Sequence, residues 1–266
     1  MRRLITSLLG ISLLLSVFLF TNGCERVLPI RTYVIGRDRS WTPLNFLGKE
    51  TNMLGFTDDL IYSIAEVEDI NIDVGASSRI ALVENLQRGA FDAIITFDAP
   101  TRRLRERYEF SNSFFDLGPV LVVPIDSDAT SLEDMIGKVV GIHTRDQIIY
   151  DVNVIPEIIF TPFENILFAF RNVAEGHLDG LIMDAFPARE YIESFYKGRL
   201  KAIPPPLTDH GLRLMALKTP AGIDLINHFN DGLQKLKDNS DYKGFLEKWR
   251  LGDLSTYTGV PEEEAQ

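Results

Sequence analysis

The 266-residue sequence contains one cysteine, four histidines and two tryptophans. A single cysteine cannot close an internal disulfide, and no Cys/His cluster has the spacing of a zinc site. We therefore expect no disulfide scaffold, no metal site and no cofactor. Positive charge is also scarce, because 27 Lys and Arg face 38 Asp and Glu and leave a net charge of −11. An acidic surface repels phosphate backbones, so nucleic-acid binding is not expected.

Long hydrophobic runs are scarce as well, and the one that stands out is at the N-terminus. Residues 4–20 carry no charge and follow Arg2 and Arg3, as in the apolar region of a secretory signal. The run is shorter than the ~20 apolar residues of a membrane span, and hydroxyl residues such as Thr6, Ser7 and Ser12 interrupt it. The rest of the chain has ordinary globular composition, 45% hydrophobic and 24% charged, with room for one or two domains.

The residues before Cys24 resemble a bacterial lipobox, in which the cysteine is lipidated and becomes the first mature residue. A small residue, Gly23, stands directly before Cys24, although Thr21 and Asn22 depart from the usual pattern. The alternative is an ordinary signal peptide with an incidental cysteine. We expect residues 1–23 to be a lipoprotein signal peptide. The mature protein is then periplasmic or at the cell surface, held to the membrane only by a lipid anchor.

Short apolar runs alternate with helical patterns in the mature chain. The predicted order is strand 32–36, helix 58–65, strand 70–74, helix 81–88 and strand 93–96. Such alternation indicates a mostly parallel sheet with helices on both faces. A second set of strands and helices follows over 139–195. A last strand over 212–217 and a helix over 221–236 come after it.

Two stretches of the chain echo each other. Residues 85–95 and 172–182 share Asn, Gly, Asp and Ile at the same spacing. The pattern is typical of a helix that ends at a glycine and is followed by a tight turn and then a buried strand. One interpretation is two lobes built alike, and the other is that such turns are common. If 117–124 and 212–218 run antiparallel, they form a hinge suited to closure around a ligand.

In this order the motifs resemble the extracytoplasmic solute-binding proteins of polar amino-acid ABC importers, bacterial solute-binding protein family 3. Each motif is weak alone, but together they cover some 220 residues of the chain. They are Tyr33-Val34-Ile35-Gly36-Arg37-Asp38, Trp41-Thr42-Pro43-Leu44-Asn45-Phe46, Gly55-Phe56-Thr57-Asp58-Asp59-Leu60, residues 86–95, Phe110-Ser111, residues 178–184 and residues 235–249.

The resemblance implies an α/β fold, the two-lobed clamshell of periplasmic-binding proteins of type 2. Each lobe is expected to be a mixed, mostly parallel sheet flanked by helices, and two hinge strands join the lobes. Lobe 1 is expected over 28–122 and 218–252, lobe 2 over 125–212, and a flexible tail over 253–266. The implied function is not enzymatic. A monomer captures a polar, zwitterionic amino acid by hinge closure and delivers it to an ABC permease in the inner membrane.

The resemblance also implies roles for three residues. Asp184 stands where the second lobe holds the ligand's α-ammonium, since a desolvated cation needs a paired carboxylate. Its alternative role is that of a helix N-cap. Trp41 falls on the aromatic wall of the pocket, or is simply a core residue. Asp38 lies where some relatives meet a cationic side chain, or it caps the turn before Trp41.

The carboxylate end of the ligand site departs from the family pattern. Relatives carry Thr-x-x-Arg at the start of the helix before Phe-Ser, and the arginine donates two hydrogen bonds to the ligand. Counting back from Phe110 without gaps puts Leu104 at that position. If residues 99–102 are aligned with the family's turn, Arg102 takes that position instead. If the gapless alignment is shifted by one residue, Arg105 takes it. The alternative for either arginine is a solvated basic helix face.

Two further departures concern specificity. Arg79 occupies the position of a second aromatic wall and could pair with Asp38 or with an anionic ligand group. The loop 141–147 is one residue shorter than in the family, and amides at the following helix start should still favour an anion. The predicted ligand site is Asp38, Trp41, Arg79, Arg102, Arg105, Thr144, Arg145 and Asp184.

Two other classes of function stay open on the sequence. Some proteins with this fold are dehydratases of small cyclic carboxylates, which need an acid or base over the ligand. Glu164, Glu175 and His143 are the candidates in the second lobe. A ligand sensor or adhesin could use the same clamshell without a transporter.

Overall fold

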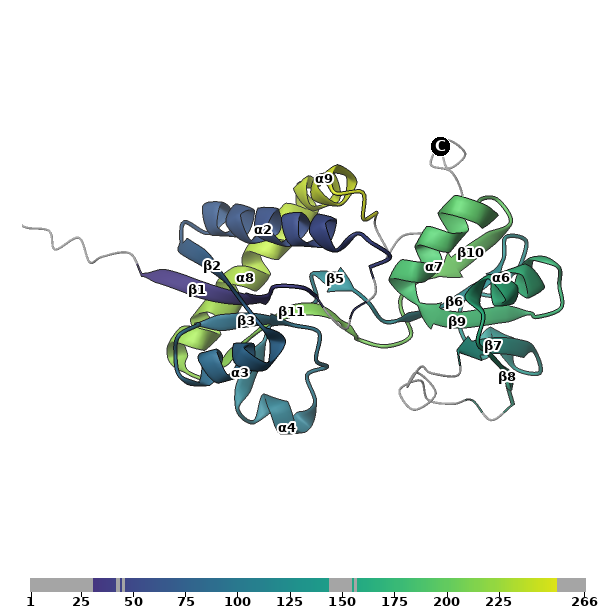
Figure 1. Ribbon diagram of the computed structural model, residues 1–266, viewed down its shortest axis with the longest axis horizontal. Helices are drawn as coiled ribbons and strands as arrows, with labels where there is room; N and C mark the ends of the chain where they lie inside the picture. The colour runs from purple at the N-terminus through teal and green to yellow at the C-terminus, as the bar shows by residue number, and fades with distance from the viewer. Residues whose placement is uncertain (1–30, 42–43, 45, 144–154, 156, 253–266) are drawn as a thin grey trace, which may run out of the picture. The chain divides into compact units, whose positions relative to one another are not determined.

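The computed structural model describes residues 31–41, 44, 46–143, 155 and 157–252. These residues form two β-sheets with helices packed against them (Figure 1). The first sheet has the strand order β2-β1-β3-β11-β4, and β5 pairs with β11 beside this path. Its strands are β1 (Thr32–Asp38), β2 (Asn71–Ser77), β3 (Ala93–Thr96), β4 (Tyr108–Phe110), β5 (Phe115–Asp116) and β11 (Gly211–Leu217).

The second sheet has the strand order β10-β6-β9-β7-β8. Four strands are arranged in the same way in both sheets. In the first sheet β2, β1 and β3 are parallel and β11 is antiparallel beside β3. In the second sheet β8, β7 and β9 are parallel and β6 is antiparallel beside β9. The prediction of two lobes built alike is confirmed in this order. The strands are β6 (Pro119–Pro124), β7 (Val139–His143), β8 (Ile159–Phe163), β9 (Gly180–Asp184) and β10 (Leu200–Ile203).

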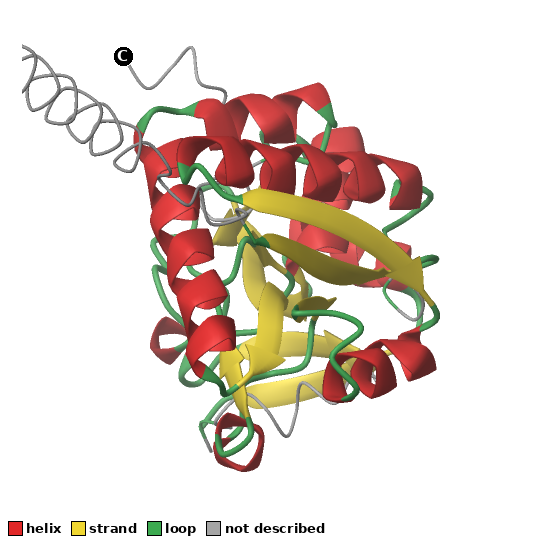
Figure 2. Ribbon diagram, turned by 90° about the vertical axis from the view of Figure 1, so that its left-hand side faces the viewer, coloured by secondary structure: helices red, strands yellow, loops and turns green. Residues whose placement is uncertain are grey.

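Helices cover both faces of the first sheet (Figures 1 and 2). Apolar side chains of α2 and α8 pack on one face, and those of α3 pack on the other against Ile94 and Met215. No helix among the described residues combines the length and hydrophobicity needed to cross a bilayer. The helices are α2 (Glu50–Val67), α3 (Arg79–Gln87), α4 (Arg102–Arg105), η1 (Glu133–Met135), α6 (Ile166–Ala174), α7 (Ala185–Tyr191), η2 (Ile192–Tyr196), α8 (Pro220–Asp238) and α9 (Asp241–Lys248).

The echoed sequence stretches fold into the same turn in both sheets. Asp92 accepts a hydrogen bond from the N–H of Val34 at 2.8 Å, and Asp179 accepts one from the N–H of Val139 at 2.8 Å. The glycines three residues before these aspartates have φ of 75° and 76°. Glycine adopts this left-handed conformation without strain. The repeated pattern therefore records a repeated helix end that ties the returning strand to its parallel neighbour.

Two segments connect the sheets, one from β5 into β6 and one from β10 into β11. The N–H groups of Leu117 and Gly118 both donate to the carbonyl oxygen of His210, at 2.9 Å. A Cβ on Gly118 would lie 2.5 Å from the carbonyl oxygen of Thr208, so glycine permits the close approach. The two segments therefore run side by side where the chain passes between the sheets.

This crossing is placed differently from the sequence expectation. The predicted hinge strands were 117–124 and 212–218. In the structure, β6 pairs with β9 and β10 of the second sheet, and β11 pairs with β3, β4 and β5 of the first. The chain passes between the sheets in the short segments just before β6 and just before β11. Both strands themselves are paired along their length with strands of their own sheet.

Glu68 follows α2, and its side chain, which is 7% exposed, meets His228 and Lys235 of α8. Its Oε2 lies 3.0 Å from Nδ1 of His228, and its Oε1 accepts a hydrogen bond from Lys235 Nζ at 2.8 Å. Burial alone raises the pKa of Glu68, but hydrogen bonds from Lys235 and His228 outweigh burial and hold this pKa below its ordinary value. The fold therefore stabilises the ionised carboxylate.

Glu68→Gln is expected to lower the free energy of unfolding by about 1–3 kcal/mol near neutral pH, the cost of losing hydrogen bonds to a charged group. Because the folded state has the lower pKa, this contribution is complete above the unfolded-state pKa and is lost as pH falls through the folded-state pKa. Urea unfolding near neutral pH and at about pH 3 measures both differences. A difference that is the same at both pH values would contradict the assignment.

Candidate functional site

A pocket of about 300 Å³ lies at the carboxyl ends of β1 and β3 and the start of α3. Strand β1 has β2 on one side and β3 on the other, so the chain reverses its direction of travel across the sheet there. Ligands of open α/β sheets bind at such a position. We call this the Trp41 pocket. It is lined by Asp38, Trp41, Arg79, Ile80, Leu82, Val83, Ile94, Ile95, Thr96, Phe97 and Asp98.

Asp38 ends β1 and is buried, with 7% of its surface exposed. Its Oδ1 accepts hydrogen bonds from the N–H of Ser40 at 2.9 Å and from Ser40 Oγ at 3.3 Å. The turn-capping role considered for Asp38 is therefore present in the structure. One carboxylate oxygen is sufficient for the turn, and Oδ2 has no hydrogen-bond partner among the described residues.

Trp41 is buried in the core and also lines the pocket. Its ring meets the ring of Phe46 edge to face, with centroids 6.3 Å apart. Its φ is 58°, an uncommon value for a large side chain. Its indole Nε1 is buried and has no hydrogen-bond partner among the described residues. Buried donors are usually paired, and exceptions concentrate at functional sites.

Arg79 is the first residue of α3 and is half-exposed at the pocket. Its guanidinium lies 4.3 Å from the ring centroid of Phe97, and its Nη2 lies 4.0 Å from Asp98 Oδ1. Asp98 in turn accepts a hydrogen bond from Thr96 Oγ1 at 3.0 Å. Arg79 is thus stacked on an aromatic ring while its charge is only loosely paired.

Asp184 lines a second pocket, of about 200 Å³, which we call the Asp184 pocket. It is the N-cap residue of α7, but its side chain makes no capping hydrogen bond. Phe97 lines both this pocket and the Trp41 pocket. The lining residues are Leu44, Phe46, Phe97, Leu117, Asp184, Phe186, Pro187, His210 and Gly211.

The two predicted carboxylate-binding arginines lie on α4, apart from these pockets. Arg102 and Arg105 are both exposed, and neither lines the Trp41 pocket or the Asp184 pocket. Arg105 Nε donates to the carbonyl oxygen of Pro100 at 2.9 Å. Thr144, Arg145 and Cys24 lie outside the described residues.

Three residues of the predicted ligand site, Asp38, Trp41 and Arg79, line one pocket in the structure. Sequence reasoning missed Phe97, Asp98 and His210, which line the pockets from the loop after β3 and from the segment before β11. A carboxylate and an aromatic ring directly after a buried strand were the available signal. Glu164 and Glu175, the acids considered for an enzyme, line neither pocket.

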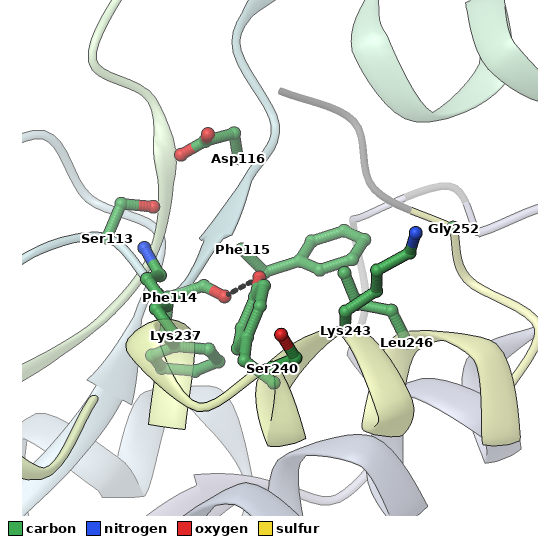
Figure 3. Close-up of a pocket in the computed structure, with 10 residues that line it drawn as sticks. Ser113, Phe114, Phe115, Asp116, Lys237, Ser240, Lys243, Leu246 and Gly252 are labelled. Atoms are coloured by element: carbon green, nitrogen blue, oxygen red, sulfur yellow. Dashed lines mark hydrogen bonds between the residues drawn. The ribbon is translucent and has the colours of Figure 1, made fainter. Parts of the chain in front are cut away.

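A third pocket, of about 300 Å³, lies between β5 and the junction of α8 and α9. Figure 3 shows the amino groups of Lys237 and Lys243 on opposite sides of it. Tyr242 also lines this pocket, and its hydroxyl group donates a hydrogen bond to the carbonyl oxygen of Phe114 at 2.6 Å. Of the predicted ligand residues that the structure describes, none lines this pocket.

Comparison with known proteins assigns the family. A model of the "bacterial extracellular solute-binding proteins, family 3" matches residues 33–252. A protein of Neisseria gonorrhoeae named "Probable histidine-binding protein" is 23% identical over 230 residues, which cover 83% of this chain and 84% of that protein. The arginine-binding extracellular protein ArtP of Bacillus subtilis (strain 168) is 22% identical over 223 residues, covering 83% of this chain and 86% of ArtP.

A solved structure supports the fold independently. The L-cystine solute receptor of Neisseria gonorrhoeae, in its unliganded open conformation, matches with a TM-score of 0.62 at 17% identity. The match covers 87% of this chain and 98% of the receptor. The predicted two-lobed α/β fold is thereby confirmed. Since the family model spans most of the sequence as well, this chain belongs to the bacterial extracellular solute-binding proteins of family 3.

Proposed function

We propose that the chain is the substrate-binding component of an ABC importer and that its ligand is a basic, zwitterionic amino acid. The observation that carries this proposal is the Trp41 pocket, in which the buried carboxylate of Asp38 keeps one oxygen for a ligand. The family assignment and relatives named for histidine and arginine support it.

The charges around the pocket favour a cationic side chain. Asp38 and Asp98 line it against one arginine, Arg79, whose charge Asp98 partly offsets. A buried carboxylate is costly unless a cation pairs with it, so Asp38 favours an ammonium, imidazolium or guanidinium group. The faces of Trp41 and Phe97 suit the flat or aliphatic part of such a side chain.

Asp184 is proposed to hold the α-ammonium group, since its acidic side chain lies among the lining residues of the Asp184 pocket. The proposed lobes are 32–117 with 211–252, and 119–203, in place of the boundaries expected from the sequence. A zwitterion that contacts both lobes binds the closed form better than the open one, and this difference drives closure. Micromolar binding requires about −8 kcal/mol, within reach of two charge-assisted clusters.

Isothermal titration calorimetry of the mature protein with the twenty L-amino acids tests this function. We expect micromolar dissociation constants for L-arginine, L-histidine or L-lysine, and at least about 10-fold weaker binding of acidic and apolar amino acids, which leave Asp38 unpaired. Binding to none of the twenty would overturn the proposal. Binding confined to acidic amino acids would overturn the role of Asp38.

The exported location is also a proposal, since residues 1–30 are outside the described residues. We propose cleavage before Cys24 and acylation of its thiol, which anchors a monomer near its permease. Cys24→Ser is expected to abolish incorporation of a radiolabelled fatty acid into the protein, because the thiol that carries the acyl chain is absent. Metabolic labelling followed by immunoprecipitation measures this loss. Equal labelling of both forms would show that Cys24 is not the acylated residue.

A further inference from the structure

A buried arginine lies on β11, in the middle of the first sheet. Arg213 has 3% of its side chain exposed, whereas the arginines of α4 are exposed. Charged side chains are rarely buried unless they are paired. The partner is Asp209, whose carboxylate accepts hydrogen bonds from Nη1 at 3.2 Å and from Nη2 at 2.9 Å, and whose backbone carbonyl oxygen also accepts one from Nη2. The Asp209 side chain is itself 75% exposed.

The pairing of Arg213 is incomplete. Its Nε is buried and has no hydrogen-bond partner among the described residues. A guanidinium group binds a carboxylate best through two adjacent N–H groups, and Asp209 takes only the outer pair of nitrogens. The inner N–H of this buried cation is therefore a donor for which the described protein supplies no acceptor.

Arg213 sits beside residues that line both pockets. Its cross-strand partner is Thr96 of β3, which lines the Trp41 pocket. Side chains directly opposite in an antiparallel pair point to the same face and lie ~5 Å apart at Cβ. Gly211, two residues earlier on that face, lines the Asp184 pocket. Arg213 thus stands between a lining residue of the Trp41 pocket on the neighbouring strand and a lining residue of the Asp184 pocket on its own strand.

We propose that Arg213 binds the α-carboxylate of the ligand, in the role that the resemblance had given to an arginine of α4. This rests on the proposed function. Leu104 stands at the gapless family position, and Arg102 and Arg105 are exposed on α4. Arg213 itself lines neither pocket, but its cross-strand partner Thr96 lines one and Gly211, two residues earlier on β11, lines the other. One oxygen of the ligand carboxylate accepts a hydrogen bond from Nε–H. The other oxygen takes the place of the exposed Asp209 carboxylate at Nη2, so that the guanidinium and the ligand carboxylate share two parallel hydrogen bonds. Asp209 is a positioning residue that holds the guanidinium until the ligand arrives.

The test compares an amino acid with its decarboxylated amine, using L-arginine and agmatine as probes. Wild type is expected to prefer L-arginine over agmatine by about 100-fold. Arg213→Met should abolish most of this preference and leave agmatine binding within about 3-fold of wild type. The matched control Arg105→Met removes an arginine of α4 and should leave both affinities within about 3-fold.

Three outcomes are distinguishable by the same titrations. If wild type binds no amino acid, the proposed function fails before Arg213 is tested. If Arg213→Met weakens L-arginine and agmatine equally, Arg213 has only a structural role and the inference is overturned. If Arg105→Met loses the preference while Arg213→Met keeps it, the arginine predicted from the sequence is the clamp and the inference is again overturned.

A measurement on wild type keeps the inference testable if Arg213→Met does not fold. In ¹⁵N,¹³C-labelled wild type, the Nε–H resonance of Arg213, assigned through its own side-chain carbons, should shift and exchange more slowly with water when unlabelled L-arginine is added. Agmatine should leave it unchanged. A resonance that does not respond to saturating L-arginine would overturn the assignment.

Discussion

Asp38→Asn is expected to weaken L-arginine binding by at least about 100-fold, because a charge-assisted pair in a desolvated site is replaced by a neutral amide. Asn keeps the shape of Asp and retains an oxygen for the two hydrogen bonds from Ser40, which hold the turn after β1. The fold around the pocket should therefore survive the substitution. The lost affinity then reports the charge of Asp38 rather than damage to the turn.

Asp73→Asn is the matched control for this prediction. Asp73 is an exposed residue of β2 whose carboxylate accepts a hydrogen bond from the N–H of Val74 at 2.9 Å. The substitution Asp73→Asn removes the same charge from the same sheet at a residue that does not line the pocket. The dissociation constant for L-arginine should therefore stay within about 2-fold of wild type. Calorimetry with L-arginine measures both variants. Equal loss in the two would mean that net charge, rather than a specific pair, governs affinity.

Gly55→Ala is expected to destabilise the protein by about 2–4 kcal/mol, although alanine is the better helix former. Gly55 lies inside α2, and a Cβ there would lie 2.1–2.4 Å from three carbons of the Trp249 ring. Moving that ring would break the hydrogen bond from Trp249 Nε1 to Asp59, which is 2.7 Å long. It would also disturb the bond from Asn52 to the Trp249 carbonyl oxygen.

Gly244→Ala in α9 provides the opposite expectation from the same substitution. A Cβ at Gly244 would meet nothing within 4 Å. Helix propensity alone then applies, and the variant should be more stable by about 0.5–1 kcal/mol. Urea unfolding of both variants gives the comparison. If both glycines respond alike, the contact between Gly55 and Trp249 does not limit stability.

The fold could be predicted where a periodic pattern extended over several residues. Strand β3 was predicted with its observed bounds, and the repeated turns after 85 and 172 were identified from four shared residues. Helix α2 was predicted only over 58–65 but begins at Glu50. Its first half contains Thr51, Asn52 and Gly55, which are weak helix formers, and packing under Trp249 stabilises it instead.

The short strands β4, β5 and β10 were not predicted as strands. Each is two to four residues long. Such short runs carry too few alternations to reveal their period. They form because β11 and β6 provide ready partners, and those partners are distant in the sequence. Pairing of this kind depends on tertiary structure rather than on local propensity.

The candidate site was predictable where its residues follow strands. Asp38 ends β1 and Trp41 follows three residues later, and both line the Trp41 pocket. Arg213 was overlooked because it interrupts the apolar run of β11, and one charged residue in a strand does not reveal its neighbours. Only the cross-strand register with Thr96 gives Arg213 its place.

The strand order constrains how a nascent or newly exported chain can fold. The second sheet is built from one uninterrupted stretch, 119–203, whereas β11 fills the gap between β3 and β4. Until residues 211–217 are available, β3 and β4 each lack the strand that pairs with them between the two. Unpaired strand edges promote aggregation. The second sheet can be complete before the first one closes. A chain interrupted ahead of β11 would therefore leave the half bearing Asp38 unfinished and in need of a chaperone.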